Sequence, residues 1–83
     1  MRALYFAWVR ERIGLNEEEI APPPDVGTVG EVIDWLKGRG DNYAHAFAEA
    51  GTIRAALDHR HAKHEAVIAG AAEIAFFPPM TGG

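Results

Sequence analysis

The chain has 83 residues, no cysteine, and eight Lys and Arg against twelve Asp and Glu, giving a formal net charge of −4. A chain of this length forms one small domain that buries only about 60–65% of its unfolded surface, and without cysteine it has no disulfide or thiolate metal site to stabilise it. Nucleic acid is disfavoured as a partner because there is no stripe of clustered cations. The apolar start is too short for a membrane span and is followed by charged residues, so we expect a cytoplasmic protein without a membrane partner.

The first half of the chain begins with two predicted strands. Residues 3–9 form a continuous apolar run that predicts a strand buried on both faces, hence central in its sheet. Residues 10–16 then predict a turn, and residues 17–21 a second, more exposed strand. Its Glu17-Glu18-Glu19 run indicates a solvated strand face, or alternatively an acidic surface that steers a basic partner.

The main helix is predicted to begin at Thr28, because Thr28 and Glu31 form a capping-box pair. One apolar stripe follows at helical spacing: Val29, Val32, Ile33 and Leu36. A short second helix is expected after Gly40, with Asp41 or Asn42 as its cap. Four large aromatic side chains, Trp8, Trp35, Tyr43 and Phe47, are assigned to the core because so small a domain needs them there.

Three further segments complete the domain. Residues 52–57 and 73–77 predict strands, whereas residues 58–68 predict a hairpin loop with a short edge strand at 65–68, whose pairing stays open. One main helix against a mixed sheet is an α+β roll. The apolar first and last strands are natural parallel neighbours in its centre. This order predicts a β-grasp, ubiquitin-like domain at residues 1–77, followed by a flexible tail at residues 78–83.

The tail is the most informative feature of the sequence. Proline cannot continue a sheet ladder, so the Pro-Pro pair directs the chain away from the domain, and glycine lets backbone enter a narrow space. Six extended residues reach about 20 Å, with an ionised carboxylate at the tip. The residues of this tail are Pro78, Pro79, Met80, Thr81, Gly82 and Gly83. Such a stalk presents a terminal carboxylate for chemistry.

Two other groups are candidate sites. His59 and His61 would share one face of a strand and form a metal pair, but a solvated polar hairpin that includes His64 is the favoured interpretation, with no metal site. The second group consists of apolar side chains that form either an exposed patch for a partner or part of the core. Its candidates are Phe76, Phe77 and Met80, with Phe6 or Trp8.

The sequence resembles the small, sulfur-carrying subunits of molybdopterin synthase, which are ubiquitin-like β-grasp proteins. The resemblance rests on Phe6-Ala7-Trp8-Val9-Arg10-Glu11 near the start and on Phe-Phe-Pro-Pro-Met-Thr-Gly-Gly at the end. It spans the whole chain, and the Phe-Phe-Pro-Pro lead-in is its specific part. Two loops depart from the family pattern: residues 69–73 lack most of its acidic side chains, and Asp58 stands where an asparagine is common.

The resemblance implies sulfur delivery through Gly83. A partner adenylating (E1-like) enzyme uses ATP and Mg to form an acyl-adenylate, which a persulfide donor converts to a thiocarboxylate. The large synthase subunit holds the precursor, cyclic pyranopterin monophosphate, and the sulfur builds the molybdopterin dithiolene within a heterotetramer. We expect the chain itself to bind no cofactor and to need its partners for catalysis. A β-grasp interaction module, a ubiquitin-like modifier and a thiamine-type sulfur carrier are the alternatives.

Overall fold

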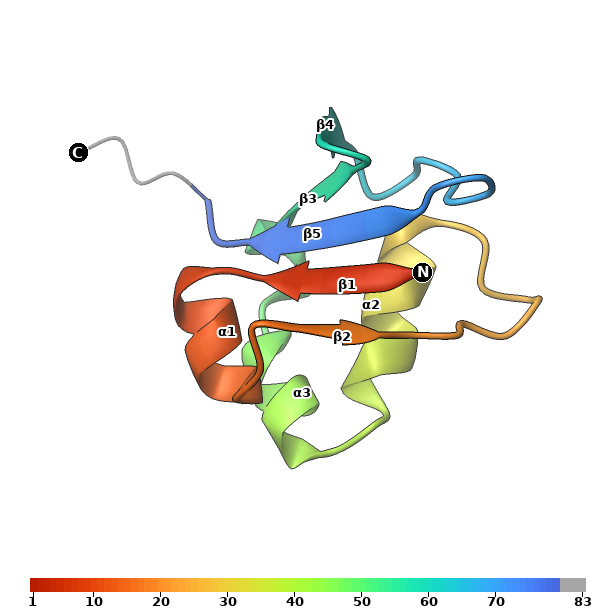
Figure 1. The fold of residues 1–83 in the computed structure, drawn as a ribbon. Coiled ribbons are helices and arrows are strands. Elements are labelled where there is room, and N and C mark those ends of the chain that lie inside the picture. The colour runs from red at the N-terminus through yellow and green to blue at the C-terminus, as the bar shows by residue number, and fades with distance from the viewer. Residues whose placement is uncertain (80–83) are drawn as a thin grey trace.

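A computed structural model describes residues 1–79 of the chain. Its five-stranded sheet has the order β2-β1-β5-β3-β4, and Figure 1 shows α2 crossing one face of it. The elements are β1 (Arg2–Tyr5), α1 (Ala7–Ile13), β2 (Glu17–Glu19), α2 (Val29–Lys37), α3 (Asp41–Ala46), a 3-10 turn η1 (Ala50–Thr52), β3 (Arg54–Leu57), β4 (Arg60–Ala62) and β5 (Glu73–Phe77). Within the described residues no helix has the length and apolar character needed to span a membrane.

The centre of the sheet is formed by the first and last strands. β5 pairs in parallel with β1, from Arg2 opposite Glu73 to Tyr5 opposite Phe76, and antiparallel with β3 on its other side. The mixed sheet with helices confirms the predicted β-grasp roll and the predicted parallel neighbours. Because parallel neighbours need a long crossover, most of the chain lies between these two strands in sequence.

The first predicted strand is too long. β1 ends at Tyr5, and residues 7–13 form the helix α1, whereas the sequence pattern predicts that they belong to the strand and the following turn. The predictions of a strand at residues 3–9 and a turn at residues 10–16 are therefore wrong in this part.

The switch from strand to helix has a local cause. Ala7 has a φ of 53°, which an extended strand does not allow, and Gly14 closes the helix with a φ of 92°. Val9 and Ile13 lie one helical turn apart and are both buried. Because residues 3–9 are all apolar, the helical spacing of the buried residues cannot be recognised within this run.

The capping box of α2 is confirmed. The Thr28 hydroxyl accepts a hydrogen bond from the Glu31 backbone N–H at 3.2 Å, and the Glu31 carboxylate accepts from the backbone N–H groups of Gly27 at 2.8 Å and Thr28 at 3.1 Å. The Gly27 bond is the main reason why the pKa of Glu31 is lowered. The predicted apolar stripe faces the sheet, and all four of its residues are buried.

The second helix is present, but its predicted cap is wrong. Gly40 occupies the N-cap position without a side-chain hydrogen bond, and Asn42 instead donates to the Ile13 carbonyl at 2.9 Å. Asn42 thereby joins α3 to the end of α1. Tyr43 and Phe47 are buried, as predicted. Trp8 and Trp35 are only partly buried and pack against the edge of the core.

The pairing within residues 58–68 is now defined. Asp58 and His59 both have positive φ, 48° and 71°, and form a two-residue hairpin turn that returns the chain as β4. The edge strand therefore lies at residues 60–62, and the prediction of an edge strand at 65–68 is wrong. Val67 makes only an isolated bridge with Thr28.

Glu18 is not part of a solvated strand face. Its carboxylate accepts hydrogen bonds from the Tyr5 hydroxyl at 2.8 Å and the Tyr43 hydroxyl at 2.7 Å, and it lies 3.4 Å from the Arg39 guanidinium. Burial, followed by this bond to Glu18, raises the pKa of Tyr5. Glu18 thus links β2, β1 and α3, and the solvated-face interpretation is wrong for this residue.

We expect Glu18→Ala to lower the free energy of unfolding by about 2–3 kcal/mol, because it leaves two tyrosine hydroxyls without their acceptor. Glu17→Ala is the control, since Glu17 is exposed and its Arg2 ion pair, at 3.5 Å, is worth at most about 1 kcal/mol. Urea denaturation measures both. Equal losses for the two variants would contradict the structural role of Glu18.

Candidate functional site

The sheet face opposite the helices is apolar in its middle. Burial alternates along β5, so that Ile74 and Phe76 face the helices, whereas Ala75 and Phe77 face outward. In the paired strands, Ala75 of β5 lies between Leu4 of β1 on one side and Ala56 of β3 on the other. These outward residues are half-buried rather than buried. The prediction that the first strand is buried on both faces is therefore wrong.

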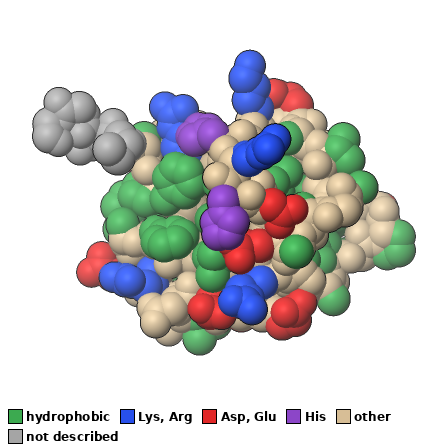
Figure 2. All heavy atoms as spheres, turned by 45° about the horizontal axis from the view of Figure 1, so that its top comes forward, with side chains coloured by type: hydrophobic (Ala, Val, Ile, Leu, Met, Phe, Trp, Pro, Cys, Tyr) green, Lys and Arg blue, Asp and Glu red, His purple; other side chains and the backbone are tan. Residues whose placement is uncertain are grey.

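Two phenylalanines extend this surface toward the end of β5. The Phe6 backbone N–H donates to the Phe76 carbonyl at 3.1 Å, directly after the last paired residues of the parallel ladder, Tyr5 and Phe76. The Phe6 side chain is 45% exposed. Figure 2 shows hydrophobic side chains gathered next to histidine and basic side chains. We call the following set the apolar sheet face: Leu4, Phe6, Ala56, Ala75 and Phe77.

Phe76 does not belong to this surface. It is fully buried, stacks on Tyr5 with ring centroids 6.2 Å apart, and meets Phe47 edge-on at 5.3 Å. The prediction of Phe76 as a partner-facing residue is wrong because neighbouring residues of a strand point to opposite faces. Phe77 and Phe6 remain candidates for the partner surface.

Trp8, the other candidate for the partner surface, lies on a helix rather than on a strand of the sheet. It is half-buried on α1, where the Arg12 guanidinium stacks 4.3 Å from its ring.

The base of the tail follows Phe77 directly. Pro78 and Pro79 are half-buried, and without an N–H group they cannot donate to a neighbouring strand. The next four positions, Met80, Thr81, Gly82 and Gly83, lie outside the described residues. The predicted stalk and its terminal carboxylate therefore stay predictions.

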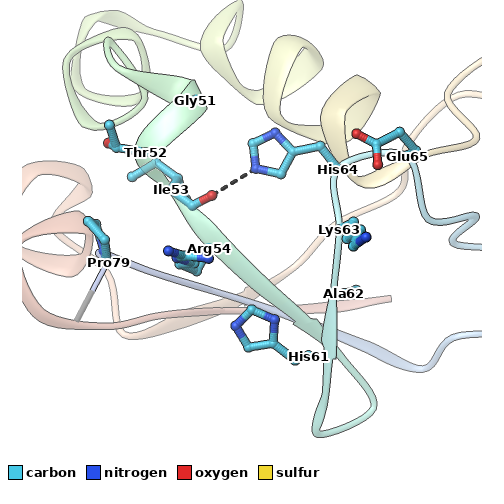
Figure 3. Close-up of a pocket in the computed structure, with 10 residues that line it drawn as sticks. All are labelled: Gly51, Thr52, Ile53, Arg54, His61, Ala62, Lys63, His64, Glu65 and Pro79. Atoms are coloured by element: carbon cyan, nitrogen blue, oxygen red, sulfur yellow. Dashed lines mark hydrogen bonds between the residues drawn. The ribbon is translucent and has the colours of Figure 1, made fainter.

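A groove of about 550 Å³ lies beside the tail base (Figure 3). It forms where β3 and β4 part, beyond the last paired residues Ala55 and Ala62. The His64 Nε2 bridges the opening at 2.7 Å from the Ile53 carbonyl oxygen. Side chains that line it include Arg54, His61, Lys63, Glu65 and Pro79. Sequence reasoning missed this groove because its walls come from η1, β3, the segment after β4 and the tail.

The histidines of the hairpin have separate neighbours. His59 lies 3.4 Å from the Glu73 carboxylate, the His61 ring meets Phe77 edge-on at 5.8 Å, and His64 contacts Ile53. Within residues 1–79, no three His, Cys, Asp or Glu side chains are placed to hold a metal ion together. The contacts favour a polar hairpin over the alternative metal pair.

Asp58 has a structural role at the same hairpin. Its carboxylate accepts hydrogen bonds from the backbone N–H groups of Ala72 at 3.0 Å and Glu73 at 3.1 Å. Asp58 therefore ties the turn after β3 to the start of β5. This is the position at which the sequence departs from the asparagine of the resembled family.

The model of the ThiS family matches residues 3–83. The chain belongs to the ThiS family. The molybdopterin synthase sulfur carrier subunits of Haemophilus influenzae and Escherichia coli are 35% and 34% identical over 83 residues, which cover 100% of this chain and 99% of each relative. The crystal structure of SAMP1 from Haloferax volcanii superposes with a TM-score of 0.73 over 100% of this chain and 98% of that one. At 24% identity, that likeness shows the β-grasp fold alone.

The two adjacent phenylalanines of this ThiS-family chain should differ in their effect on stability. We expect Phe76→Leu to lower the free energy of unfolding by about 1–2 kcal/mol, because it leaves space in a closely packed core. Phe77→Leu, on the half-buried outer face, should cost less than about 0.5 kcal/mol. Thermal and urea denaturation measure both. A larger loss for Phe77→Leu would contradict the assigned faces.

Proposed function

We propose that this chain is the sulfur-carrier subunit of a molybdopterin synthase and that Gly83 carries the sulfur. Two relatives with that name match it over their whole length at 34–35% identity. The observation that carries the proposal is the position of the tail base. Pro78 and Pro79 follow a strand fixed between two neighbours in the sheet, so the last residues start from a rigid support beside the apolar sheet face.

The chemistry starts from an unreactive group. Both oxygens of the Gly83 carboxylate share its negative charge, and neither is a good leaving group. An adenylating (E1-like) partner, using ATP and Mg, supplies the leaving group by forming an acyl-adenylate at the Gly83 carbonyl and releasing pyrophosphate. Attack by a persulfide sulfur expels AMP, and a thiol then reduces the resulting acyl disulfide to the thiocarboxylate. No cysteine is present in the chain, so no side chain competes as the sulfur carrier.

The thiocarboxylate then acts as a soft, ionised nucleophile. It attacks a carbon of the pterin precursor, cyclic pyranopterin monophosphate, which the large subunit binds and orients, and it displaces an oxygen substituent from that carbon. Water then hydrolyses the resulting thioester, which leaves the sulfur on the pterin and returns Gly83 to its carboxylate. The molybdopterin dithiolene needs two sulfur atoms, and each small subunit delivers one, within a heterotetramer of two large and two small subunits. This chain supplies the reacting atom, whereas its partners supply positioning and electrostatic stabilisation.

The partner surfaces follow from the same arrangement. A partner that takes up the tail must approach the end of β5, where Phe6 and Phe77 lie. Aromatic side chains are enriched in the buried centres of protein interfaces, so we assign the apolar sheet face to the large subunit. A channel lined by Lys or Arg of the partner would hold the ionised end of the tail. The absence of side chains at Gly82 and Gly83 suits a narrow channel.

The tail itself provides the test. Gly82→Val, or one alanine added after Gly83, should reduce sulfur transfer to the pterin precursor by about 10²-fold or more, because the reacting carbonyl is displaced or blocked. Insertion of one alanine between Pro24 and Asp25, which are both exposed and outside the apolar sheet face, is the matched control and should leave transfer unchanged. Cofactor synthesis is measured in a strain that lacks its own small subunit.

A second candidate function, a β-grasp interaction module with an inert tail, is favoured by the exposed Phe6 side chain alone. It predicts that the tail variants bind and support the partner as well as the unaltered chain. Full activity of the alanine-extended chain, shown to be untrimmed by mass spectrometry, would support the module and reject the sulfur carrier.

A further inference from the structure

Charge is unevenly distributed over the sheet. The acidic run of β2 is neutralised within the domain, because each of its carboxylates lies near a cation. Glu17 lies 3.5 Å from Arg2, Glu18 lies 3.4 Å from Arg39, and Glu19 lies 2.6 Å from the N-terminal amine. Although the chain has more acids than bases, this edge therefore offers little free negative charge to a partner.

The other edge of the sheet, at β3 and β4, carries basic side chains that line the groove. Arg54 and Lys63 are exposed and line the groove beside the tail base, and neither forms an ion pair within residues 1–79. His61 and His64 line the same groove, where Glu65 is the only acid among the described lining residues. Figure 3 shows Arg54 between Pro79 and His61. The groove therefore has a surplus of positive charge in a domain of net negative charge.

The groove adjoins both features that the proposed function assigns to the partner. Pro79, the last described residue, forms part of its wall. Arg54 pairs across the ladder with Phe77, and the His61 ring packs against Phe77, so the apolar sheet face is continuous with the groove. A partner that covers the apolar sheet face and takes up the tail also covers the groove.

We propose that the groove receives an acidic segment of the large subunit, located at the mouth of the channel that takes the tail. The inference rests on the proposed function. Positive charge at Arg54 and Lys63 stands at the base of the tail, and the carboxylate or thiocarboxylate of Gly83 stands four residues beyond Pro79. This order of charges, basic at the base of the tail and acidic at its end, is complementary to a channel with acidic side chains at its mouth and basic side chains inside. It is complementary only if the end of the tail enters first. The match steers the encounter and sets the direction in which the tail enters.

Stopped-flow association with the large subunit of the same organism tests this inference. Charge reversal at the groove, Arg54→Glu or Lys63→Glu, should lower kon by about tenfold at low salt and leave koff within about twofold, because charges at an interface rim act mainly on association. Lys37→Glu on α2 is the matched control: it changes the net charge equally, lies outside the groove, and should leave kon within about twofold. The difference between groove and control variants should shrink toward 1 M salt.

The possible outcomes separate this inference from the function on which it rests. Groove variants that associate as fast as the Lys37→Glu control would overturn the acidic-segment proposal, whereas sulfur transfer through Gly83 would stand. Failure of the unaltered chain to bind the large subunit would reject the proposed function itself. Circular dichroism and thermal denaturation show whether the variants fold, and Arg54→Gln, which removes one charge without reversing it, should give a smaller reduction in kon of the same kind.

Discussion

The parallel pairing of β1 with β5 is the constraint on which the rest of the structure depends. It brings the two ends of the described chain into the centre of one sheet, and it requires the helices and the β3–β4 hairpin to lie between them in sequence. β3 then flanks β5 on its other side, so the last strand is held by two ladders. Whatever follows Phe77 starts from one of the most firmly fixed strands of the domain.

Side chains of β5 alternate between the core and the outer face of the sheet, so this strand both stabilises the domain and supports the tail. Ile74 and Phe76 fill the core between the sheet and the helices, whereas Ala75 and Phe77 form the middle of the apolar sheet face. One five-residue strand therefore anchors the domain, supplies part of the proposed partner surface and supports the tail. The groove at Arg54 and Lys63 adds charge beside the same point, so apolar, basic and tail features all meet at the end of β5.

Local signals in the sequence predicted much of this arrangement. The Thr28–Glu31 capping box predicted the start of α2, and the terminal motif indicated the family. The errors arose where contacts distant in sequence determine the structure. The apolar run gave no sign that the strand ends before Ala7. The adjacent residues Phe76 and Phe77 could not be assigned to opposite faces without the register of the sheet. The hairpin turn at Asp58 and the groove, whose walls come from distant segments, depend on contacts that no local pattern reports.

The central claim is that the C-terminal carbonyl is where sulfur is carried and that the folded body acts as its support. Intact-mass spectrometry after incubation with the adenylating partner, MgATP and a persulfide donor tests it most directly. The account predicts the mass gain of one oxygen-for-sulfur replacement, assigned by fragmentation to Gly83. An unmodified acid under conditions in which the partner modifies a known sulfur carrier, or a sulfur atom found elsewhere in the chain, would contradict it.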